Sequence, residues 1–407
     1  MAKFDETPII KDPAKDGILT PPPIREHASA EVHCHPSKAK DTQLINLPAE
    51  RVPDWQEKAI EKFGELLEKN QSLQVFMDVC VRCGACTDKC QFYLGTGDPQ
   101  NFPVERAELM RQVYRRYFTP GGRKFPSLNQ ASDLDEDMLQ RWYTYFYQCS
   151  ECRRCSVFCP YGIDTAEITM AAREIMSSIG VSTKYVTEVV AKVYQTGNNL
   201  GIPPLAWKDN CEFLEEDIQE ETGLPIRFPV DECGADILLV PPSADNFANT
   251  DTMIGYAKVF HALGISWTTS PQCNEGGNFG LFLNFQNLKK VNKRIVDAAR
   301  MLGVKTIIWG ECGHAWRGAV FTPTLNGPMD MFNPPYPYHI SQFLADMLNK
   351  GAFDGRLDKS ANDEYVVTYH APCNSARAGM LLDEPREISR ACCNNFLEMP
   401  AETIREK

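Results

Sequence analysis

Two runs of four cysteines share one spacing. In each run, two, two and three residues separate successive cysteines, and a proline follows the last cysteine of the second run: Cys80, Cys83, Cys86 and Cys90, then Cys149, Cys152, Cys155 and Cys159 with Pro160. Bacterial ferredoxins hold [4Fe–4S] clusters on cysteines spaced in this way. The two runs therefore predict two cubane clusters.

The ferredoxin pattern also predicts how the cysteines are shared, because the first three of a run bind one cluster and the fourth binds the other. We therefore assign the ligands as Cys80, Cys83, Cys86 and Cys159 for the first cluster, and Cys149, Cys152, Cys155 and Cys90 for the second. Gln91 follows Cys90 where Pro160 follows Cys159, so the first run departs from the pattern there. The alternative is two structural zinc sites of four thiolates each, but zinc ribbons usually place their cysteine pairs farther apart.

Three more cysteines each follow an expected strand in the C-terminal part of the chain: Cys273, Cys312 and Cys373. Because ligands gather at the carboxyl ends of strands in α/β folds, we expect these cysteines to share a second, catalytic site. His314 and His370 lie close to two of them and could give a proton to a departing thiolate, or could simply bond the backbone at a strand end. The alternative for the cysteines is a role as small buried side chains.

Five cysteines are expected to have no function: Cys34, Cys211, Cys233, Cys392 and Cys393. Cys34 stands between two histidines, but a flexible arm holds metal ligands poorly. A basic group occurs in the 58 residues between the two runs: Arg111, Arg115, Arg116, Arg123 and Lys124. It is either a solvated face or a docking patch for an acidic partner or an anionic lipid surface.

The composition bounds the class of protein. The chain has 407 residues, of which 43% are hydrophobic, and this is enough for two or three domains. Its net charge of −12 has the wrong sign for a bulk phosphate-backbone binder, so we expect no nucleic-acid partner. The apolar runs are far shorter than the ~20 residues that span a bilayer, and the N-terminus has no apolar leader. We expect a cytoplasmic chain, whose 16 cysteines indicate metal or redox chemistry rather than disulfides.

The order of the expected helices and strands along the sequence predicts an α+β multidomain chain. Residues 1–50 are expected to be an extended N-terminal arm, and residues 51–180 a helical ferredoxin-type domain with helices over 103–118, 136–148 and 164–180. Residues 181–234 are expected to be a linker with one connecting helix over 184–195 and with Pro203 and Pro204 in loops.

Residues 235–407 are predicted to form an α/β domain. Short apolar segments alternate there with helix-like stretches, a pattern typical of buried parallel strands. The expected strands are 237–240, 265–268, 306–309 and 365–369, and the expected helices are 252–263, 288–302 and 340–349.

Taken together, these residues resemble the heterodisulfide-reductase-like iron–sulfur proteins. In that family, two related α/β halves each carry a Cys…Cys-Cys-Gly…Cys-x-x-Cys (CCG) signature that binds a non-cubane [4Fe–4S] cluster. Residues 369–373, 384–388 and 396–399 are similar to the opening of the second signature. More narrowly, residues 80–97, 149–173 and 309–317 are similar to DsrK-type subunits, the cytoplasmic catalytic subunits of membrane-bound DsrMKJOP complexes of sulfur-metabolising prokaryotes.

The chain departs from this family in both halves. In the first half, Cys273 stands where the family has its Cys-Cys pair, and Cys312 stands alone at the Cys-x-x-Cys position. No cysteine matches the opening position near Ser243, so the first signature is degenerate. In the second half, Cys373 matches the opening cysteine, and Lys407 lies 34 residues later, where the Cys-Cys-Gly is expected. We therefore expect a truncated domain, with the remaining ligands of a non-cubane cluster beyond residue 407.

The resemblance implies a peripheral subunit at the inner face of the cell membrane, attached through partner subunits. Electrons from menaquinol would pass through a membrane haem b subunit of the DsrM type and two [4Fe–4S] clusters to a disulfide or trisulfide on a DsrC-type protein. In this layout the haems and the two cubanes would deliver electrons one at a time, whereas cleavage of a sulfur–sulfur bond takes two, so a special cluster would hold the half-reduced sulfur species between electrons. The alternatives are a pure electron-relay subunit, an iron–sulfur subunit of a hydroxy-acid oxidase, and a zinc-structured interaction protein.

Overall fold

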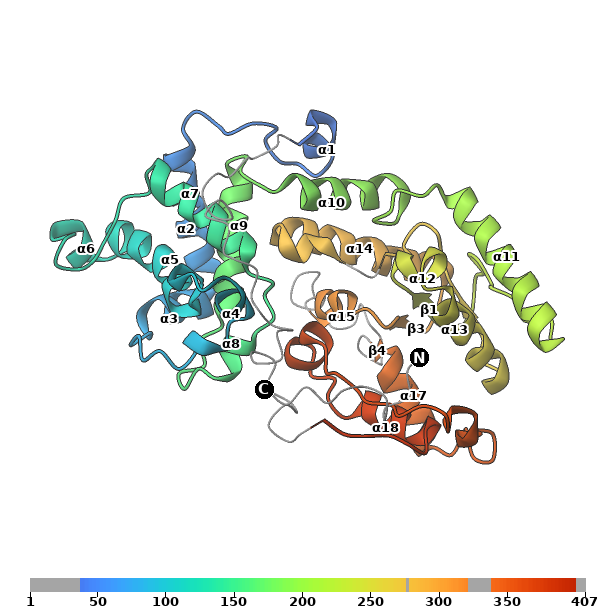
Figure 1. Ribbon diagram of the computed structural model, residues 1–407. Helices are drawn as coiled ribbons and strands as arrows, with labels where there is room; N and C mark the ends of the chain where they lie inside the picture. Colours follow the sequence, from blue (N-terminus) through green and yellow to red (C-terminus); the bar gives the residue numbers. More distant parts are fainter. Residues whose placement is uncertain (1–36, 276–277, 321–337, 400–407) are drawn as a thin grey trace.

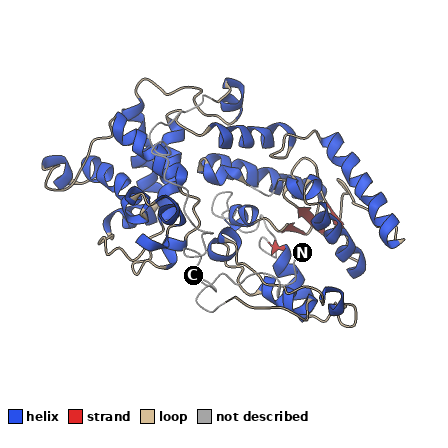
Figure 2. Cartoon of the chain, viewed as in Figure 1, coloured by secondary structure: helices blue, strands red, loops and turns tan. Residues whose placement is uncertain are grey.

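The computed structural model describes residues 37–275, 278–320 and 338–399, and most of them lie in helices (Figure 1, Figure 2). A helical part, coloured blue to green in Figure 1, lies beside a part that contains a small parallel sheet. No helix within the described ranges is long and apolar enough to cross a bilayer. Cys34 lies outside the described residues.

The helical part follows a short first helix, α1 (Ala39–Leu44). Its helices are α2 (Trp55–Lys69), α3 (Gln71–Asp78), α4 (Gln91–Thr96), α5 (Pro103–Phe118), α6 (Pro120–Lys124), α7 (Glu136–Gln148), α8 (Arg154–Val157) and α9 (Thr165–Ser178), with 3₁₀ turns η2 (Thr87–Lys89) and η3 (Pro99–Asn101). The predicted helices over 103–118, 136–148 and 164–180 are confirmed as α5, α7 and α9.

The helical part encloses one apolar core. Phe63, Trp142 and Phe146 are fully buried in it, with ring centroids 6.3 Å apart for the first pair and 5.8 Å apart for the second. Asp135 begins α7 by accepting a hydrogen bond from Met138 N at 2.9 Å, as a side-chain N-cap does. This core fixes the helices from which both cysteine loops emerge.

The second part contains four parallel strands in the order β2-β1-β3-β4. They are β1 (Ile237–Val240), β2 (Trp267–Thr268), β3 (Thr306–Trp309) and β4 (Tyr338–His339). The surrounding helices are α10 (Lys184–Thr196), α11 (Pro204–Thr222), α12 (Ser243–Phe247), α13 (Thr250–Leu263), α14 (Phe285–Leu302), α15 (Gly313–Val320), α17 (Ile340–Asn349) and α18 (Glu384–Cys392). Three short turns complete it: η4 (Phe279–Phe282), η6 (Lys359–Asn362) and the π-helical η7 (Cys373–Ala378).

Both faces of this sheet are covered by helices, which explains its continuous apolar strands. Alternate side chains of β1 enter different cores: Ile237 and Leu239 pack with α11 and α13, whereas Leu238 and Val240 pack with α14 and α15. The predicted strands 237–240 and 306–309 are confirmed as β1 and β3, paired in register from 237 with 306 to 240 with 309. The structure thus confirms a helix-rich chain with a small parallel sheet.

Three sequence expectations differ from the structure. Residues 365–369 form no strand, because β4 occupies the edge of the sheet beside β3 and only an isolated bridge joins Val367 to Phe396. The expected extended arm contains α1, and Ile45 directly after it is fully buried against α10. Pro203 and Pro204 begin the long helix α11 rather than a loop, because proline suits the first turn of a helix.

His339 connects the sheet to the helix that follows. It ends β4 and caps α17, where its Nδ1 accepts a hydrogen bond from Ser341 N at 3.1 Å and its own backbone N–H donates to Gln342 Oε1 at 3.2 Å. Burial lowers the pKa of His339 to about 4. The folded chain therefore holds this imidazole neutral at pH values where the unfolded chain protonates it.

We expect His339→Asn to keep the cap and remove this titration, because asparagine is a good N-cap. Below pH 6.5 the unfolded wild-type chain binds one more proton at this position, so its free energy of unfolding falls as the pH drops towards 4. Relative to the variant, the loss is roughly 1.4 kcal/mol per pH unit between about pH 6 and pH 5. Denaturant unfolding of both proteins across this range measures it, and parallel stability curves would contradict it.

Candidate iron–sulfur centres and the cysteine site of the sheet

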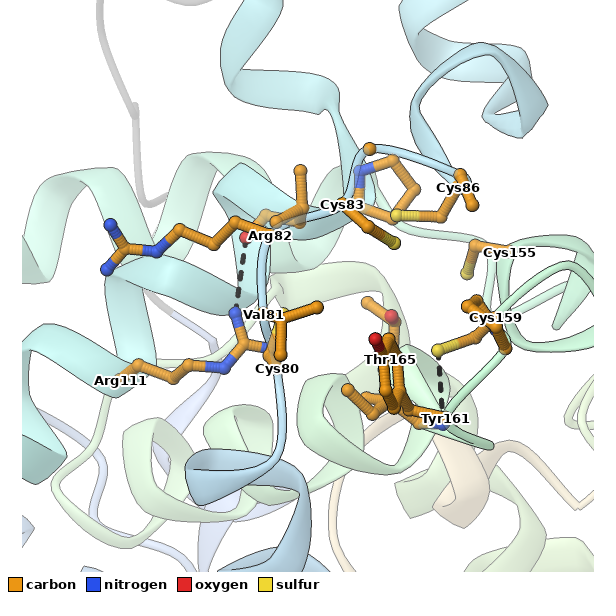
Figure 3. A pocket seen from close by; sticks show the side chains of 16 residues that line it. Cys80, Val81, Arg82, Cys83, Cys86, Arg111, Cys155, Cys159, Tyr161 and Thr165 are labelled. Atoms are coloured by element: carbon orange, nitrogen blue, oxygen red, sulfur yellow. Dashed lines mark hydrogen bonds between the residues drawn. The ribbon is translucent and has the colours of Figure 1, made fainter.

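The cysteines assigned to the first cluster line one pocket (Figure 3): Cys80, Cys83, Cys86 and Cys159. Three of them come from the loop after α3, and Cys159 comes from the second run, after α8. Burial, and then the nearby Cys159 and Cys80 thiols, raise the pKa of the Cys86 thiol to about 11. The fold therefore brings the last cysteine of one run to the first three of the other.

The second triplet lies against the same region. Burial raises the pKa of the Cys155 thiol, with smaller contributions from Cys149 and Cys152, so these three thiols are close neighbours. Cys155 also lines the pocket of the first set, which places the two sets side by side.

The residue after the fourth cysteine of the first run contacts the second cysteine run. Cys90 is buried, and the Nε2 of Gln91 donates a hydrogen bond to Ser150 Oγ at 2.9 Å. This contact joins the residue after Cys90 to the residue after Cys149. The role of all eight cysteines as ligands nevertheless remains a prediction.

The two loops share one backbone conformation. At equivalent positions, two residues after the first cysteine and one after the second, φ is positive: 55° and 78° at Arg82 and Gly84, and 53° and 60° at Glu151 and Arg153. Left-handed backbone costs a non-glycine residue about 1–2 kcal/mol. Two such turns bend each loop so that cysteines close in sequence lie around a common centre.

Each non-glycine residue in these turns has an ionic partner that stabilises the conformation. Arg82 Nη2 lies 2.6 Å from Glu108 Oε1, and Arg153 Nη2 lies 2.6 Å from Asp164 Oδ2. Arg153 is therefore paired with a carboxylate of the helical part itself.

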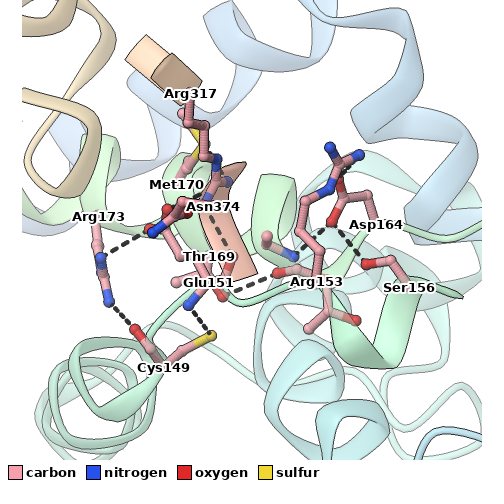
Figure 4. Close-up of polar contacts among 12 residues, drawn as sticks. Cys149, Glu151, Arg153, Ser156, Asp164, Thr169, Met170, Arg173, Arg317 and Asn374 are labelled. Carbon is pink, nitrogen blue, oxygen red and sulfur yellow. Dashed lines mark hydrogen bonds and ion pairs between the residues drawn. The ribbon is translucent and has the colours of Figure 1, made fainter. Parts of the chain in front are cut away.

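Glu151 lies at the centre of a buried ion network (Figure 4). Its carboxylate is fully buried, with Oε1 2.7 Å from Arg173 Nη1 and Oε2 3.5 Å from Arg317 Nη2. Burial raises the pKa of Glu151, and the two guanidinium groups oppose that rise. Arg173 also donates to the carbonyl of Cys149 at 2.5 Å, so the network holds the second loop directly.

Two arginines from the part that contains the sheet donate hydrogen bonds to the second cysteine loop. Arg317, on α15, donates from Nη1 to the carbonyl of Glu151 at 2.8 Å and to Asn374 Oδ1 at 3.1 Å. Arg377, in η7, donates from Nε to the carbonyl of Cys152 at 3.0 Å. The sequence gave neither residue a role, because both occur far from the cysteine runs, although Arg317 ends the segment 309–317 that carries the family resemblance.

The expected cysteine site of the sheet is assembled in part. Cys312 directly precedes α15 and Cys373 begins η7, and these segments touch: a Cβ on Gly313 would lie 3.0 Å from Ser375 N and 3.1 Å from the Cβ of Asn374. The structure therefore brings the surroundings of Cys312 and Cys373 together.

Cys273 belongs to the same apolar core as Cys312 but has other charged neighbours. Burial raises the pKa of Cys273 to about 12 and that of Cys312 to about 11. Arg294 and Asp231 act on Cys273, whereas Glu311 acts on Cys312. Within the described ranges, no three His, Cys, Asp or Glu side chains converge as ligands of a single metal ion.

The two histidines lie in different surroundings. The His314 ring packs against Phe282 and Phe279, with centroids 5.0 and 5.8 Å away. Burial, and then the charge of Arg317, lower the pKa of His314, so it is neutral near pH 7. His370 is exposed.

Two acidic side chains that the sequence analysis did not single out, Asp245 and Glu311, follow the carboxyl ends of β1 and β3. Tyr256 OH donates to Asp245 Oδ2 at 3.2 Å and accepts from Glu311 N at 3.0 Å. Burial, and then the neighbouring Glu311 carboxylate, raise the pKa of Asp245 to about 7. The only signal in the sequence was the position of Asp245 soon after an expected strand.

Comparison with known proteins shows the family to which the chain belongs. Residues 76–163, which span both cysteine runs, match the model of a 4Fe-4S dicluster domain. The chain is 42% identical over 403 residues to the Hdr-like menaquinol oxidoreductase iron-sulfur subunit 2 of Archaeoglobus fulgidus, covering 90% of this chain and 72% of that protein. It is 38% identical over 435 residues to the Hdr-like menaquinol oxidoreductase iron-sulfur subunit of Archaeoglobus profundus, covering 98% and 78%.

The chain belongs to the family of Hdr-like menaquinol oxidoreductase iron–sulfur subunits. A more distant relative, 22% identical over 77% of this chain and 72% of its own length, is a subunit of the dihydromethanophenazine:CoB--CoM heterodisulfide reductase of Methanosarcina barkeri. No solved structure matches the chain. The predicted heterodisulfide-reductase-like character and the oxidoreductase class are thereby confirmed.

The cysteine loops of this Hdr-like subunit fit [4Fe–4S] clusters in their donor chemistry. Thiolates are the ligands of such clusters, and hydrogen bonds to their sulfurs tune the potential. The backbone N–H of Glu151 donates to Cys149 Sγ at 3.3 Å, and that of Ile163 donates to Cys159 Sγ at 3.4 Å. The dicluster match over the same residues supports iron–sulfur clusters rather than zinc.

We expect Gly313→Ala to destabilise the Hdr-like subunit by about 1–2 kcal/mol, because the new Cβ would press the Cys312 segment against η7. Gly255→Ala is the matched control: it also adds a methyl group in a helix, but nothing lies within 4 Å of the new Cβ. The control should gain about 0.5–1 kcal/mol, since alanine favours helix. Thermal unfolding compares them, and equal effects would show that the segments are not closely packed.

Proposed function

We propose that this chain is a DsrK-type subunit that passes electrons from menaquinol to a sulfur–sulfur bond on a DsrC-type partner protein. Menaquinol would be oxidised at a membrane haem b subunit of the DsrM type, which would also hold the chain at the inner face of the cell membrane. The observation that carries the proposal is the contact of Arg317 and Arg377 with the second cysteine loop. These arginines follow Cys312 and Cys373 closely in sequence, so the electron-carrier loop and the cysteine site of the sheet adjoin.

The chain's own residues would hold two [4Fe–4S] clusters as the ferredoxin pattern assigns them: Cys80, Cys83, Cys86 and Cys159 for one, and Cys149, Cys152, Cys155 and Cys90 for the other. The clusters, when bound, supply one-electron carriers. The left-handed turns orient the thiolates, the backbone N–H groups at Glu151 and Ile163 stabilise their negative charge, and the apolar core excludes water from behind them.

The overall reaction balances between quinol and disulfide. Menaquinol releases two electrons and two protons on oxidation, and a disulfide takes up two of each as it becomes two thiols. A trisulfide takes up four of each and also releases hydrogen sulfide. Cys312 and Cys373 mark the place in the chain where we propose that the sulfur partner docks.

The described residues do not by themselves fit a non-cubane cluster at this place, because Cys273, Cys312 and Cys373 supply three thiolates, fewer than the five cysteines of one full CCG signature. We therefore assign no step to such a cluster. The same observation favours a second candidate function, that of a relay subunit that accepts and passes on electrons while another subunit acts on the substrate.

The ligand assignment predicts selective loss of clusters. Cys159→Ala should remove the first cluster and Cys90→Ala the second, each lowering the iron content of the anaerobically purified chain from about eight towards about four atoms. The exposed Cys233 provides the control, and Cys233→Ala should keep both clusters. Iron analysis and EPR of the reduced protein measure the outcome. If Cys159→Ala removed the second cluster and spared the first, the crosswise sharing would be wrong.

The two candidate functions differ in their dependence on Cys373. In the purified complex, with a menaquinol analogue as donor and a disulfide-bearing DsrC-type protein as acceptor, we expect Cys373→Ala to lower the rate of disulfide reduction at least 100-fold while both cubanes stay reducible by dithionite. Cys392→Ala, which changes another half-buried cysteine of the same part, should be as active as wild type. Full activity of Cys373→Ala would refute the reductase function and leave the relay function.

A further inference from the structure

We propose that Arg317 positions the loop of the second cubane against the Cys373 segment and raises the reduction potential of that cluster. The inference rests on the proposed function, because it assumes that Cys149, Cys152 and Cys155 hold a cluster. It assigns a role to a residue that lies outside both cysteine runs.

The side chain of Arg317 joins two loops that belong to different parts of the chain. It is buried on α15, with a side chain only 3% exposed. From Nη1 it donates both to the Glu151 carbonyl, at 2.8 Å, and to Asn374 Oδ1, at 3.1 Å (Figure 4). Asn374 directly follows Cys373, and Glu151 lies between Cys149 and Cys152. A rigid guanidinium fork bound on both sides fixes the distance between the two loops.

Arg317 also contributes charge at the second loop. Its Nη2 lies 3.5 Å from the Glu151 carboxylate, whose other oxygen pairs with Arg173. All three side chains are buried, so their charges are screened little by water. Glu151 is also coupled to the ligand set directly, since its backbone N–H donates to Cys149 Sγ at 3.3 Å.

The sign of the effect follows from the charge that reduction adds. A reduced cluster carries one more negative charge, which a nearby cation stabilises and a nearby carboxylate destabilises. Loss of Arg317 leaves Glu151 with one guanidinium partner instead of two, so the second cluster should become harder to reduce. Loss of the Glu151 carboxylate leaves two cations beside the loop, so the cluster should become easier to reduce.

The test is an EPR-monitored redox titration of the full-length chain, loaded with iron and sulfide anaerobically. We expect Arg317→Gln to lower the potential of the second cluster and Glu151→Gln to raise it, each changing the one-electron equilibrium constant roughly tenfold, which is about 59 mV. The double variant should lie close to wild type. The first cluster should keep its potential throughout, since its pocket contains neither residue.

Arg386→Gln is the matched control. Arg386 is likewise buried, pairs with a carboxylate (Glu398, 3.1 Å) and donates to a backbone carbonyl (Leu382, 2.5 Å). These partners lie outside the second loop, so the loss of Arg386 should not shift either cluster. If Arg317→Gln does not retain the second cluster, Arg317→Lys, which keeps the charge, should restore the cluster and its potential, and Glu151→Gln decides the sign on its own.

Several results would overturn the inference. The network would be only structural if Arg317→Gln and Glu151→Gln left the potential of the second cluster unchanged or shifted it in the same direction. Equal shifts of the potentials of both clusters would lead to the same conclusion. The network would also be only structural if Arg317→Lys failed to restore the second cluster and Glu151→Gln left the potential of that cluster unchanged. Absence of a second [4Fe–4S] signal in wild type would refute the proposed function instead.

Discussion

The arrangement of this molecule depends on one buried carboxylate and the arginines around it. Glu151 is fully buried in the loop of the second cysteine run, and it is held by Arg173 from its own part and by Arg317 from the part with the sheet. An ion inside a protein needs partners to offset its lost hydration, so this charge requires the two parts to meet there. The contact therefore fixes the cysteine loops and the sheet relative to one another.

The sheet places Arg317 and the segment after Cys373 against the second cysteine loop. Because β1 and β3 are buried on both faces, their carboxyl ends lie within the apolar cores on the two sides of the sheet. Cys312 and α15 follow β3 directly, and α15 carries Arg317 to the loop of the helical part. The conformation of η7 is tied to the same point through Asn374 and Arg377. A packed α/β core thus places charged groups beside the second cysteine loop.

Local patterns explain why much of the fold could be predicted. The helices α5, α7 and α9 and the strands β1 and β3 have strong periodicity or continuous apolar runs. Predictions failed where distant contacts decide: residues 365–369 have a composition suited to a strand, but the edge position belongs to β4, whose short sequence gave no signal. Ile45 is buried only because α10 and η4 provide apolar partners for it.

By itself, the sequence determined the chemistry: eight cysteines at ferredoxin spacing, and a family whose members are oxidoreductase subunits. Spacing suffices for this because three of the four ligands expected for each cluster are close along the chain. Only the tertiary structure decided which charges surround the second loop. Glu151, Arg317 and Asn374 are separated by more than 50 residues at each step and follow no periodic pattern, and burial alone turns them from ordinary polar residues into a strong electrostatic contact.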